Sequence, residues 1–392
     1  MNINQIKEWA GENFKEIVAA RRHFHTYPEL GEKEFETQRY IMGYLKALGI
    51  ECREIASTGV MAWVNGRPGK RVVAVRGDMD ALPIQEESSA PYCSKNDGVM
   101  HACGHDAHTA ITLGCAKYFK EHEGEFAGIV KFFFQPAEET VGGAKRMVAE
   151  GCMKNPDVDY VIGLHVMPML DYNQAEVRYG ARNASTDNVE LIVKGKGCHG
   201  AYPEMGADAI VMAAHIIAAL QTVVSRNVSP VDSAVLTFGK IEGGTAGNVI
   251  CDNVKIKGTI RAAKEETRKM LKKQIQNISQ AVAGAMGGCC DVNINDGYPL
   301  VYNNSEVLDV IAANAAALFG QEQVFNKGEC SMGGEDFSFF CNDAKGAFYN
   351  LGCRIKGKEN NMAHTKWFDI DERCLETGLT LQIMNILSLL RK

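Results

Sequence analysis

The chain lacks the features that mark secreted, membrane or nucleic-acid-binding proteins. Its first residues contain no basic stretch followed by an apolar one, so no signal peptide is visible. No uninterrupted apolar run approaches the roughly 18 residues that span a bilayer. No block of lysine and arginine stands out, and the net charge of −6 argues against a nucleic-acid partner. We therefore expect a cytoplasmic protein that binds neither membrane nor nucleic acid.

Disulfides are not expected either, although the sequence contains 13 cysteines. Their number is odd and they are scattered through a long chain, which is typical of free thiols in a reducing compartment. Hydrophobic residues make up 46% of the chain and charged residues 23%, the composition of an ordinary globular protein. A length of 392 residues allows two domains, each with its own core.

The alternation of strand and helix patterns over the first 180 residues or so predicts an α/β domain. Runs of β-branched, aromatic and other apolar residues predict strands at 71–76, 128–134 and 160–164. Apolar residues at helical spacing predict helices at 37–48 and 107–119.

From about residue 184 the order of elements changes to strand, helix, strand, strand, helix, strand, which is the ferredoxin-like order. The α/β pattern resumes after residue 300. The elements expected from residue 184 onward are strands 188–193, 234–241, 253–262, 291–295 and 347–351 and helices 207–224, 265–285, 305–319 and 372–390. We therefore predict a mixed sheet flanked by helices, formed by residues 1–183 and 296–392, with residues 184–295 as an inserted ferredoxin-like lid and dimerisation domain.

The densest group of reactive side chains lies in segment 100–108, which holds Cys103 and three of the ten histidines. A Cys-x-His spacing in a loop before a helix can place a thiolate and an imidazole on one metal ion, so Cys103 and His105 are candidate ligands. The alternative is a helix N-terminus capped by Asp106 with histidines on the surface.

Two carboxylate clusters follow predicted strands. In the pair Glu138 and Glu139, one carboxylate can bind metal while the other accepts a proton from water. In the cluster that holds Asp78 and Asp80, an aspartate can orient a ligand histidine through its second ring nitrogen. A solvated loop and an Asx turn are the alternatives.

Two single histidines, His165 and His364, supply the further nitrogen ligands that a second ion needs, although a lone histidine is more often structural. His165 again follows a predicted strand. Because ligands of open α/β sheets bind beyond the carboxyl ends of the strands, the clusters that end strands predict one shared site.

Together these motifs resemble the N-acyl-amino-acid amidohydrolases of bacteria, a group that includes hippurate hydrolases and the plant auxin-conjugate hydrolases. That group is a branch of the co-catalytic metallopeptidases related to aminoacylase. The resemblance runs nearly end to end, and its landmarks are segments 21–30, 76–83, 100–108, 135–139, 163–165, 195–203 and 332–337.

The resemblance implies two divalent ions, with zinc or manganese favoured and cobalt or nickel compatible. It makes Glu138 the general base toward the attacking water and Asp80 a support of the metal centre. The wider clan has a histidine where this chain has Asp78, so Asp78 is not expected to be a ligand. The implied ligands are Cys103, His105, Glu139, His165 and His364.

The resemblance also implies a homodimer formed through the lid. His199 matches a lid histidine that stabilises the tetrahedral oxyanion, commonly in the partner subunit, while Asn248 and Arg261 match positions that contact substrate. The expected substrate is an N-acyl amino acid or small peptide. A dipeptidase or aminopeptidase, an N-acetyl-diamino-acid deacetylase and a non-catalytic homologue remain alternatives, and segment 335–336 has no assigned role.

Overall fold

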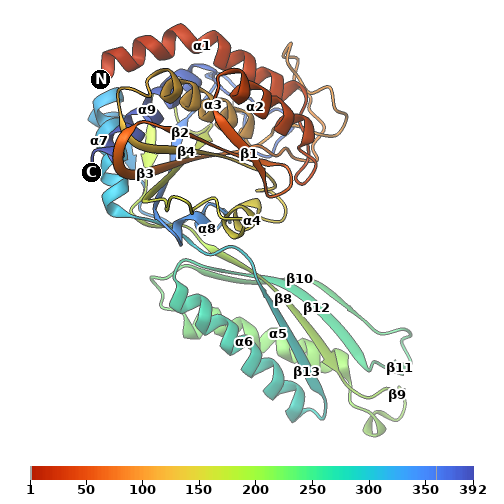
Figure 1. Cartoon of the computed structure of the whole chain (residues 1–392). Helices are drawn as coiled ribbons and strands as arrows, with labels where there is room; N and C mark the ends of the chain where they lie inside the picture. Colours follow the sequence, from red (N-terminus) through yellow and green to blue (C-terminus); the bar gives the residue numbers. More distant parts are fainter. Residues whose placement is uncertain (1, 359) are drawn as a thin grey trace. The chain divides into compact units, whose positions relative to one another are not determined.

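The computed structural model describes residues 2–358 and 360–392 and divides into two compact units (Figure 1). The first unit comprises Met1–Gly180, Tyr302–Gly328 and Asp336–Lys392, and the second comprises Ala181–Val301 and Glu329–Glu335. These boundaries differ by a few residues from 183/184 and 295/296. The sequence also gave no reason to assign Glu329–Glu335 to the second unit.

Backbone pairing explains why that short segment joins the second unit. Ser331 donates its N–H to the carbonyl of Arg182 and accepts the N–H of Ala184. The partners are about 150 residues apart along the chain, so no local pattern announces the pairing.

An eight-stranded mixed sheet in the order β1-β2-β4-β3-β5-β16-β6-β15 forms the centre of the first unit. The neighbours β4, β3, β5 and β16 run parallel, and β2 and β6 are antiparallel to their neighbours β4 and β16. The strands are β1 (Glu51–Ile55), β2 (Gly59–Asn65), β3 (Arg67–Asp78), β4 (Ala127–Gln135), β5 (Tyr160–Met167), β6 (Ala175–Val177), β15 (Val324–Asn326) and β16 (Lys345–Gly352). The central parallel strands are buried on both faces, which explains their nearly continuous apolar runs.

Helices cover both faces of this sheet (Figure 1). One continuous core joins α1, α3, α7 and α9 to the sheet. On the other face, α8 stacks Phe340 on Phe133 of β4, with 5.3 Å between ring centroids. The helices of this unit are α1 (Ile3–Thr26), α2 (Phe35–Ala47), α3 (His105–Glu121), α4 (Gly143–Ala149), α7 (Ser305–Phe319), α8 (Ser338–Cys341), the 3-10 helix η2 (Gln321–Gln323) and α9 (Arg373–Leu390).

The second unit contains a four-stranded antiparallel sheet in the order β10-β12-β8-β13, with α5 and α6 sharing a core with it. The chain order β8-α5-β10-β12-α6-β13 confirms the ferredoxin-like pattern. The elements are β8 (Ser185–Lys194), β9 (Cys198–His199), η1 (Pro203–Met205), α5 (Ala209–Asn227), β10 (Ala234–Gly243), β11 (Val249–Ile250), β12 (Asn253–Ala262), α6 (Glu265–Ala285) and β13 (Cys289–Asp296). Two short strands, β7 (Gly180–Asn183) and β14 (Val301–Asn303), lie where the chain passes between the units.

By length and composition alone, α5 is apolar enough to cross a membrane. The sequence predicts no membrane span at this position, because polar residues interrupt the apolar run. One side of α5 supplies Met212, Ile216 and Leu220 to the core of the second unit. This packing accounts for much of the helix's apolar character.

Candidate metal centre

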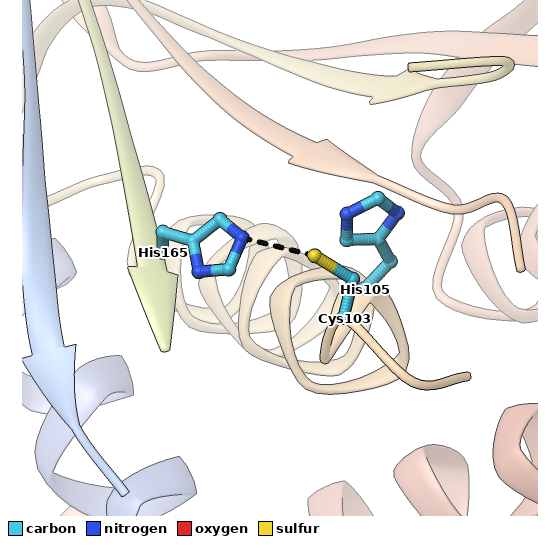
Figure 2. Close-up of side chains that lie close together, drawn as sticks. All are labelled: Cys103, His105 and His165. Atoms are coloured by element: carbon cyan, nitrogen blue, oxygen red, sulfur yellow. Dashed lines mark hydrogen bonds between the residues drawn. The ribbon is translucent and has the colours of Figure 1, made fainter. Parts of the chain in front are cut away.

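The predicted ligands of the first unit meet beyond the carboxyl ends of β3, β4 and β5, as the strand-end argument expects. Asp80 follows β3, Glu139 follows β4, and His165 lies near the end of β5. Cys103 and His105 stand at the start of α3 (Figure 2).

Cys103 is the shared member of two ligand groups. Its Sγ lies 3.4 Å from Nε2 of His165 and 3.3 Å from Nε2 of His364. Figure 2 shows the sulfur directed toward His165, with His105 next to it. The ligand atoms of Cys103, His105 and His165 all lie within 4.8 Å of one another, and so do those of Cys103, Glu139 and His364. The arrangement suits two neighbouring ions that share the thiolate.

Asp80 fixes the orientation of His105. Nδ1 of His105 lies 2.9 Å from the backbone carbonyl of Asp80 and 3.2 Å from its Oδ1, so Nδ1 carries the donated proton. Nε2 is then the unprotonated nitrogen, and it is buried with no hydrogen-bond partner among the described residues. Such an unpartnered buried nitrogen is costly unless a cation binds it.

The second oxygen of Asp80 holds the backbone of Glu139, whose N–H donates to Oδ2 over 3.0 Å. Oε1 of Glu139 lies 3.1 Å from Nε2 of His364. It nevertheless has no partner in hydrogen-bond geometry within the described part of the chain. A carboxylate and an imidazole that lie this close can both bind one ion.

Two segments of the site have an unusual backbone conformation. Ala137, before the glutamate pair, has φ +55°, and His364 has φ +63°, a left-handed region that non-glycine residues rarely adopt. Glu34 accepts the N–H of Ala137, and Ala102 accepts the N–H of His364 over 2.7 Å. Such conformations cluster at functional sites, where surrounding contacts hold them in place.

Electrostatics also favour a bound cation. Burial raises the pKa of the Cys103 thiol well above its usual range, so the thiolate needs a nearby positive charge. Burial lowers the pKa of His165, which keeps this imidazole neutral and able to bind metal. At His105 burial also acts to lower the pKa, but the negative charges of Asp78 and Cys103 and the hydrogen bond to Asp80 together raise it, which shows that the surroundings of this ring favour a positive charge.

Glu138 is half-buried, and a carboxylate oxygen of it lies within 4.8 Å of the ligand atoms of both His105 and Glu139. At this range the carboxylate can accept a proton from a water held beside the ligand atoms. The predicted base is therefore at the edge of the ligand cluster.

Asp78 approaches His105, with 3.5 Å between Oδ2 and Nε2. Its oxygens are occupied, however, because Oδ2 accepts from Arg76 and Oδ1 lies 2.6 Å from Nδ1 of His108. Asp336 accepts from the same arginine over 3.0 Å. The sequence analysis assigned no role to Arg76, His108 or Asp336, although each lies within a landmark segment.

The sequence analysis also gave no role to the buried group of charged side chains around Arg21 on α1. Nε of Arg21 donates to Asp106 over 2.7 Å, and Nη2 donates to Asp369 over 3.0 Å. His25 contacts the same oxygen of Asp106 at 2.7 Å. Arg21 thus joins the residue after His105 to the loop that carries His364. Opposite charges far apart in the sequence are the only signal, and sequence alone cannot pair them.

The second unit brings two of its three predicted residues together. His199 in β9 pairs with Val249 in β11, and Gly200 donates its N–H to the carbonyl of Asn248. His199 is exposed, and its Nδ1 accepts the N–H of Ala201 over 3.0 Å.

Arg261 lies elsewhere in the unit. Its Nη1 donates to the hydroxyl of Thr259 and to the carbonyl of Ile260. Arg261 is near the far end of β12, about 25 Å from Asn253, at the rise of an extended strand. His199 lies in β9, which pairs with β11 and follows β8 in the chain. Because β8 ends opposite Asn253, His199 lies toward the other end of β12 from Arg261. One copy of the second unit therefore does not place all three side chains together.

Comparisons with known proteins agree with this architecture. The model of peptidase family M20/M25/M40 matches residues 74–383. The hippurate hydrolase of Campylobacter jejuni is 40% identical over 347 residues, which cover 88% of this chain and 89% of that protein. The N-acetyl-L-cysteine deacetylase of Bacillus subtilis is 40% identical over 341 residues, covering 86% of this chain and 80% of that protein.

Solved structures show the same relationship. A putative aminohydrolase from methicillin-resistant Staphylococcus aureus matches with a TM-score of 0.95 and 34% identity, over 99% of this chain and all of the other. The YXEP protein of Bacillus subtilis, described as a dinuclear metal-binding peptidase from the M20 family, matches with a TM-score of 0.85 and 31% identity, over 97% and 99% of the two chains. With its cluster of side chains suited to divalent metals, the chain belongs to peptidase family M20/M25/M40 and is an amide hydrolase of that family.

Proposed function

We propose that the chain hydrolyses the amide bond of N-acyl amino acids, with two divalent ions and with Glu138 as general base. The observation that carries the proposal is the cluster itself. Cys103 is common to two ligand groups, and Glu138 lies within 4.8 Å of one ligand atom from each group, on His105 and Glu139. The relatives named for hippurate and N-acetylcysteine point to the same class of substrate.

The ligands suit divalent transition metals. Cys103 would be shared between the ions, with His105 and His165 on one side and Glu139 and His364 on the other. A thiolate and three imidazoles favour zinc by softness, and the carboxylate also admits manganese, cobalt or nickel. When bound, the ions would polarise the scissile carbonyl and lower the pKa of the attacking water.

Glu138 would supply the proton transfers. One of its carboxylate oxygens takes a proton from the attacking water and then gives it to the nitrogen of the leaving amino acid. Asp80 keeps the proton of His105 on Nδ1, so that Nε2 stays available throughout. The same carboxylate thus acts as base and as acid within one turnover.

Residues of the second unit would complete the site in a homodimer. We assign His199 to the oxyanion that forms when water attacks the carbonyl, and Arg261 and Asn248 to the substrate, with Arg261 on its carboxylate. Within one copy, Arg261 lies about 25 Å along β12 from Asn253, and His199 follows the end of β8 opposite Asn253, so the two side chains are too far apart to contact one small substrate. We therefore propose that one of them comes from the partner subunit, in a dimer of cytoplasmic chains.

A deacetylase of N-acetylated diamino acids is the second candidate, because several relatives carry the name N-acetyldiaminopimelate deacetylase. The chemistry would be unchanged, and only the group that recognises the far end of the substrate would differ. A dipeptidase is the third candidate, and it would require a free amine in the substrate.

The test is a hydrolysis screen that crosses acetyl, benzoyl and long-chain acyl groups with a panel of amino acids. Diaminopimelate derivatives and free-amine dipeptides are included, and Mn²⁺, Zn²⁺ or Co²⁺ is added. We expect the highest kcat/KM for an N-acyl amino acid. Preference for free-amine dipeptides, or no turnover by a chain that has bound metal, would contradict the proposal.

A further inference from the structure

Val166 connects the parts of the metal centre that α3 and β5 supply. Its N–H donates to Nε2 of His108 over 2.9 Å, and its carbonyl accepts from Nδ1 of His165 over 2.8 Å. Its side chain packs against Gly104, where an added Cβ would meet Cγ2 of Val166 at 2.3 Å. One residue therefore contacts the ring of His165 and the segment between Cys103 and His105.

His108 supplies a hydrogen-bond acceptor for β5 beyond the point where β3 stops pairing with it. β3 pairs with β5 only as far as Arg76 opposite Gly163, whereas β16 continues on the other side, with Leu351 opposite Val166. A buried N–H beyond the end of β3 needs another acceptor, since an unpaired one would be costly. The imidazole of His108, on α3, provides that acceptor.

Asp78 in turn fixes the ring of His108. Because Nε2 of His108 accepts a hydrogen bond, the neutral ring carries its proton on Nδ1 and donates it to Oδ1 of Asp78 over 2.6 Å. Gly77 allows this close approach of α3 and β3. A Cβ at Gly77 would lie 2.7 Å from the carbonyl oxygen of His108 and 2.6 Å from Oγ1 of Thr112.

The same contacts continue to Asp336. Arg76 donates to Asp78 and, through Nη2, to Oδ1 of Asp336 over 3.0 Å. Gln135 also donates to Asp336, over 2.8 Å, and accepts from Nε of Arg76 over 2.8 Å. All of these side chains and that of His108 are at most 1% exposed. A fully paired buried network of this kind holds its members in one arrangement.

We propose that His108 is a positioning residue for the metal centre. By accepting the N–H of Val166, it fixes the carbonyl that orients the ring of His165, and it thereby sets the affinity for the ion held by Cys103, His105 and His165. The inference rests on the proposed function in one respect, namely that these three residues bind metal. Partners that orient a ligand histidine typically change metal affinity about 10- to 100-fold.

Two substitutions test the two hydrogen bonds of His108 one at a time. His108→Gln places an amide oxygen near the position of Nε2 and can still accept from Val166. His108→Asn is shorter, so its amide can donate to Asp78 but does not reach Val166. Both keep a polar, uncharged side chain of smaller or similar size.

The experiment titrates Co²⁺ into the apoprotein of the wild type and both variants and follows the visible d–d bands and the thiolate-to-cobalt charge-transfer band. We expect His108→Asn to weaken one of two binding steps about 10- to 100-fold and to change the d–d bands. His108→Gln should stay within a few-fold of the wild type. His122→Asn, at the other end of α3, is the control and should bind Co²⁺ as the wild type does.

Two results would overturn the inference. One is wild-type Co²⁺ affinity and bands for His108→Asn. The other is an equal loss in both variants, because the acceptor at Val166 would then not matter. Thermal unfolding of each apoprotein shows whether the variants fold.

If His108→Asn does not fold, ¹⁵N NMR of the histidine rings in the wild-type apoprotein decides the question. We expect a neutral His108 with the proton on Nδ1, and a proton on Nε2 would overturn the inference. Co²⁺ binding as expected without hydrolysis of any N-acyl amino acid would contradict only the proposed function. A wild-type chain that binds no Co²⁺ would overturn both.

Discussion

The two units hold their predicted functional residues in different ways. In the first unit each predicted histidine ligand has a second contact: the ring of His105 with Asp80, the ring of His165 with the carbonyl of Val166, and the backbone N–H of His364 with Ala102. In the second unit His199 is exposed, its ring accepts the N–H of Ala201, and its centroid lies 5.6 Å from that of Tyr202.

This difference matches the chemistry that each unit would perform. Ligands that surround charged ions must be held within fractions of an ångström. His105 is buried and His165 half-buried, whereas His364 is exposed and is held through its backbone. Groups that contact a substrate can complete their geometry when the substrate binds. Substitutions in the first unit should therefore act on metal binding, folding and kcat, and those in the second unit on catalysis or KM without loss of metal.

The largest expected effect separates the two glutamates of the first unit. Glu138→Gln should lower kcat about 10²- to 10⁴-fold, because a general base is lost, while metal content stays at the wild-type level. Glu139→Gln should lose metal as well as activity. Steady-state kinetics paired with elemental analysis measure both. Full activity of Glu138→Gln would show that another group accepts the proton.

The second-largest effect is expected for the buried ion pairs of Arg21. Arg21→Met should lower the free energy of unfolding of the apoprotein by about 3–5 kcal/mol, because Asp106 and Asp369 lose their buried partner. The neighbouring Arg22→Met is a matched control, since Arg22 is largely exposed and pairs with Glu372. Its cost should be about 0–1 kcal/mol. Urea unfolding that shows equal costs would remove the distinction.

In the second unit, His199→Ala should lower kcat about 100-fold through loss of the oxyanion contact, with metal content unchanged. His215→Ala, an exposed histidine on α5, should leave kcat unchanged.

Mixing subunits sharpens this prediction. In a mixture of His199→Ala and Glu138→Gln chains, heterodimers would contain one intact site if His199 acts in the partner's cleft. Activity should then recover to about a quarter of the wild-type value. No recovery, once the subunits are shown to exchange, would place both residues in a site built by one chain.

The smallest effect concerns Arg261. Arg261→Met should raise KM about tenfold with little change in kcat, because it removes a charged contact to the substrate carboxylate. Lys257→Met lies on the same side of β12 and is the matched control. A KM equal to that of the control would limit Arg261 to its contacts with Thr259 and Ile260.

The sequence predicted most of the fold because the deciding patterns are local. Asn253–Ala262 and Glu265–Ala285 form a strand and a helix with the predicted bounds. Residues 3–26 were given no element, although Asn2 and Gln5 form a capping box at the start of α1. Many polar positions, one of them the buried Arg21, interrupt its apolar pattern.

The candidate site was predictable only in part. Cys103 and His105 are close in sequence, so their spacing alone indicates a ligand pair. His364 joins them through a hydrogen bond from its N–H to Ala102, across more than 250 residues, so no local pattern placed it there and its assignment as a ligand depended on the family resemblance. The link from His108 through Val166 to His165 depends on where β3 stops pairing with β5, which no residue pattern reveals.

We propose that Cys103 would bind both ions, and counting bound Co²⁺ tests this proposal most directly. Titrated apoprotein of the wild type should bind two Co²⁺ per chain and show the thiolate-to-cobalt band, as should the exposed-cysteine control Cys289→Ser. Cys103→Ala should bind at most one ion and lack the band. Two Co²⁺ and an unchanged band in Cys103→Ala would contradict the account.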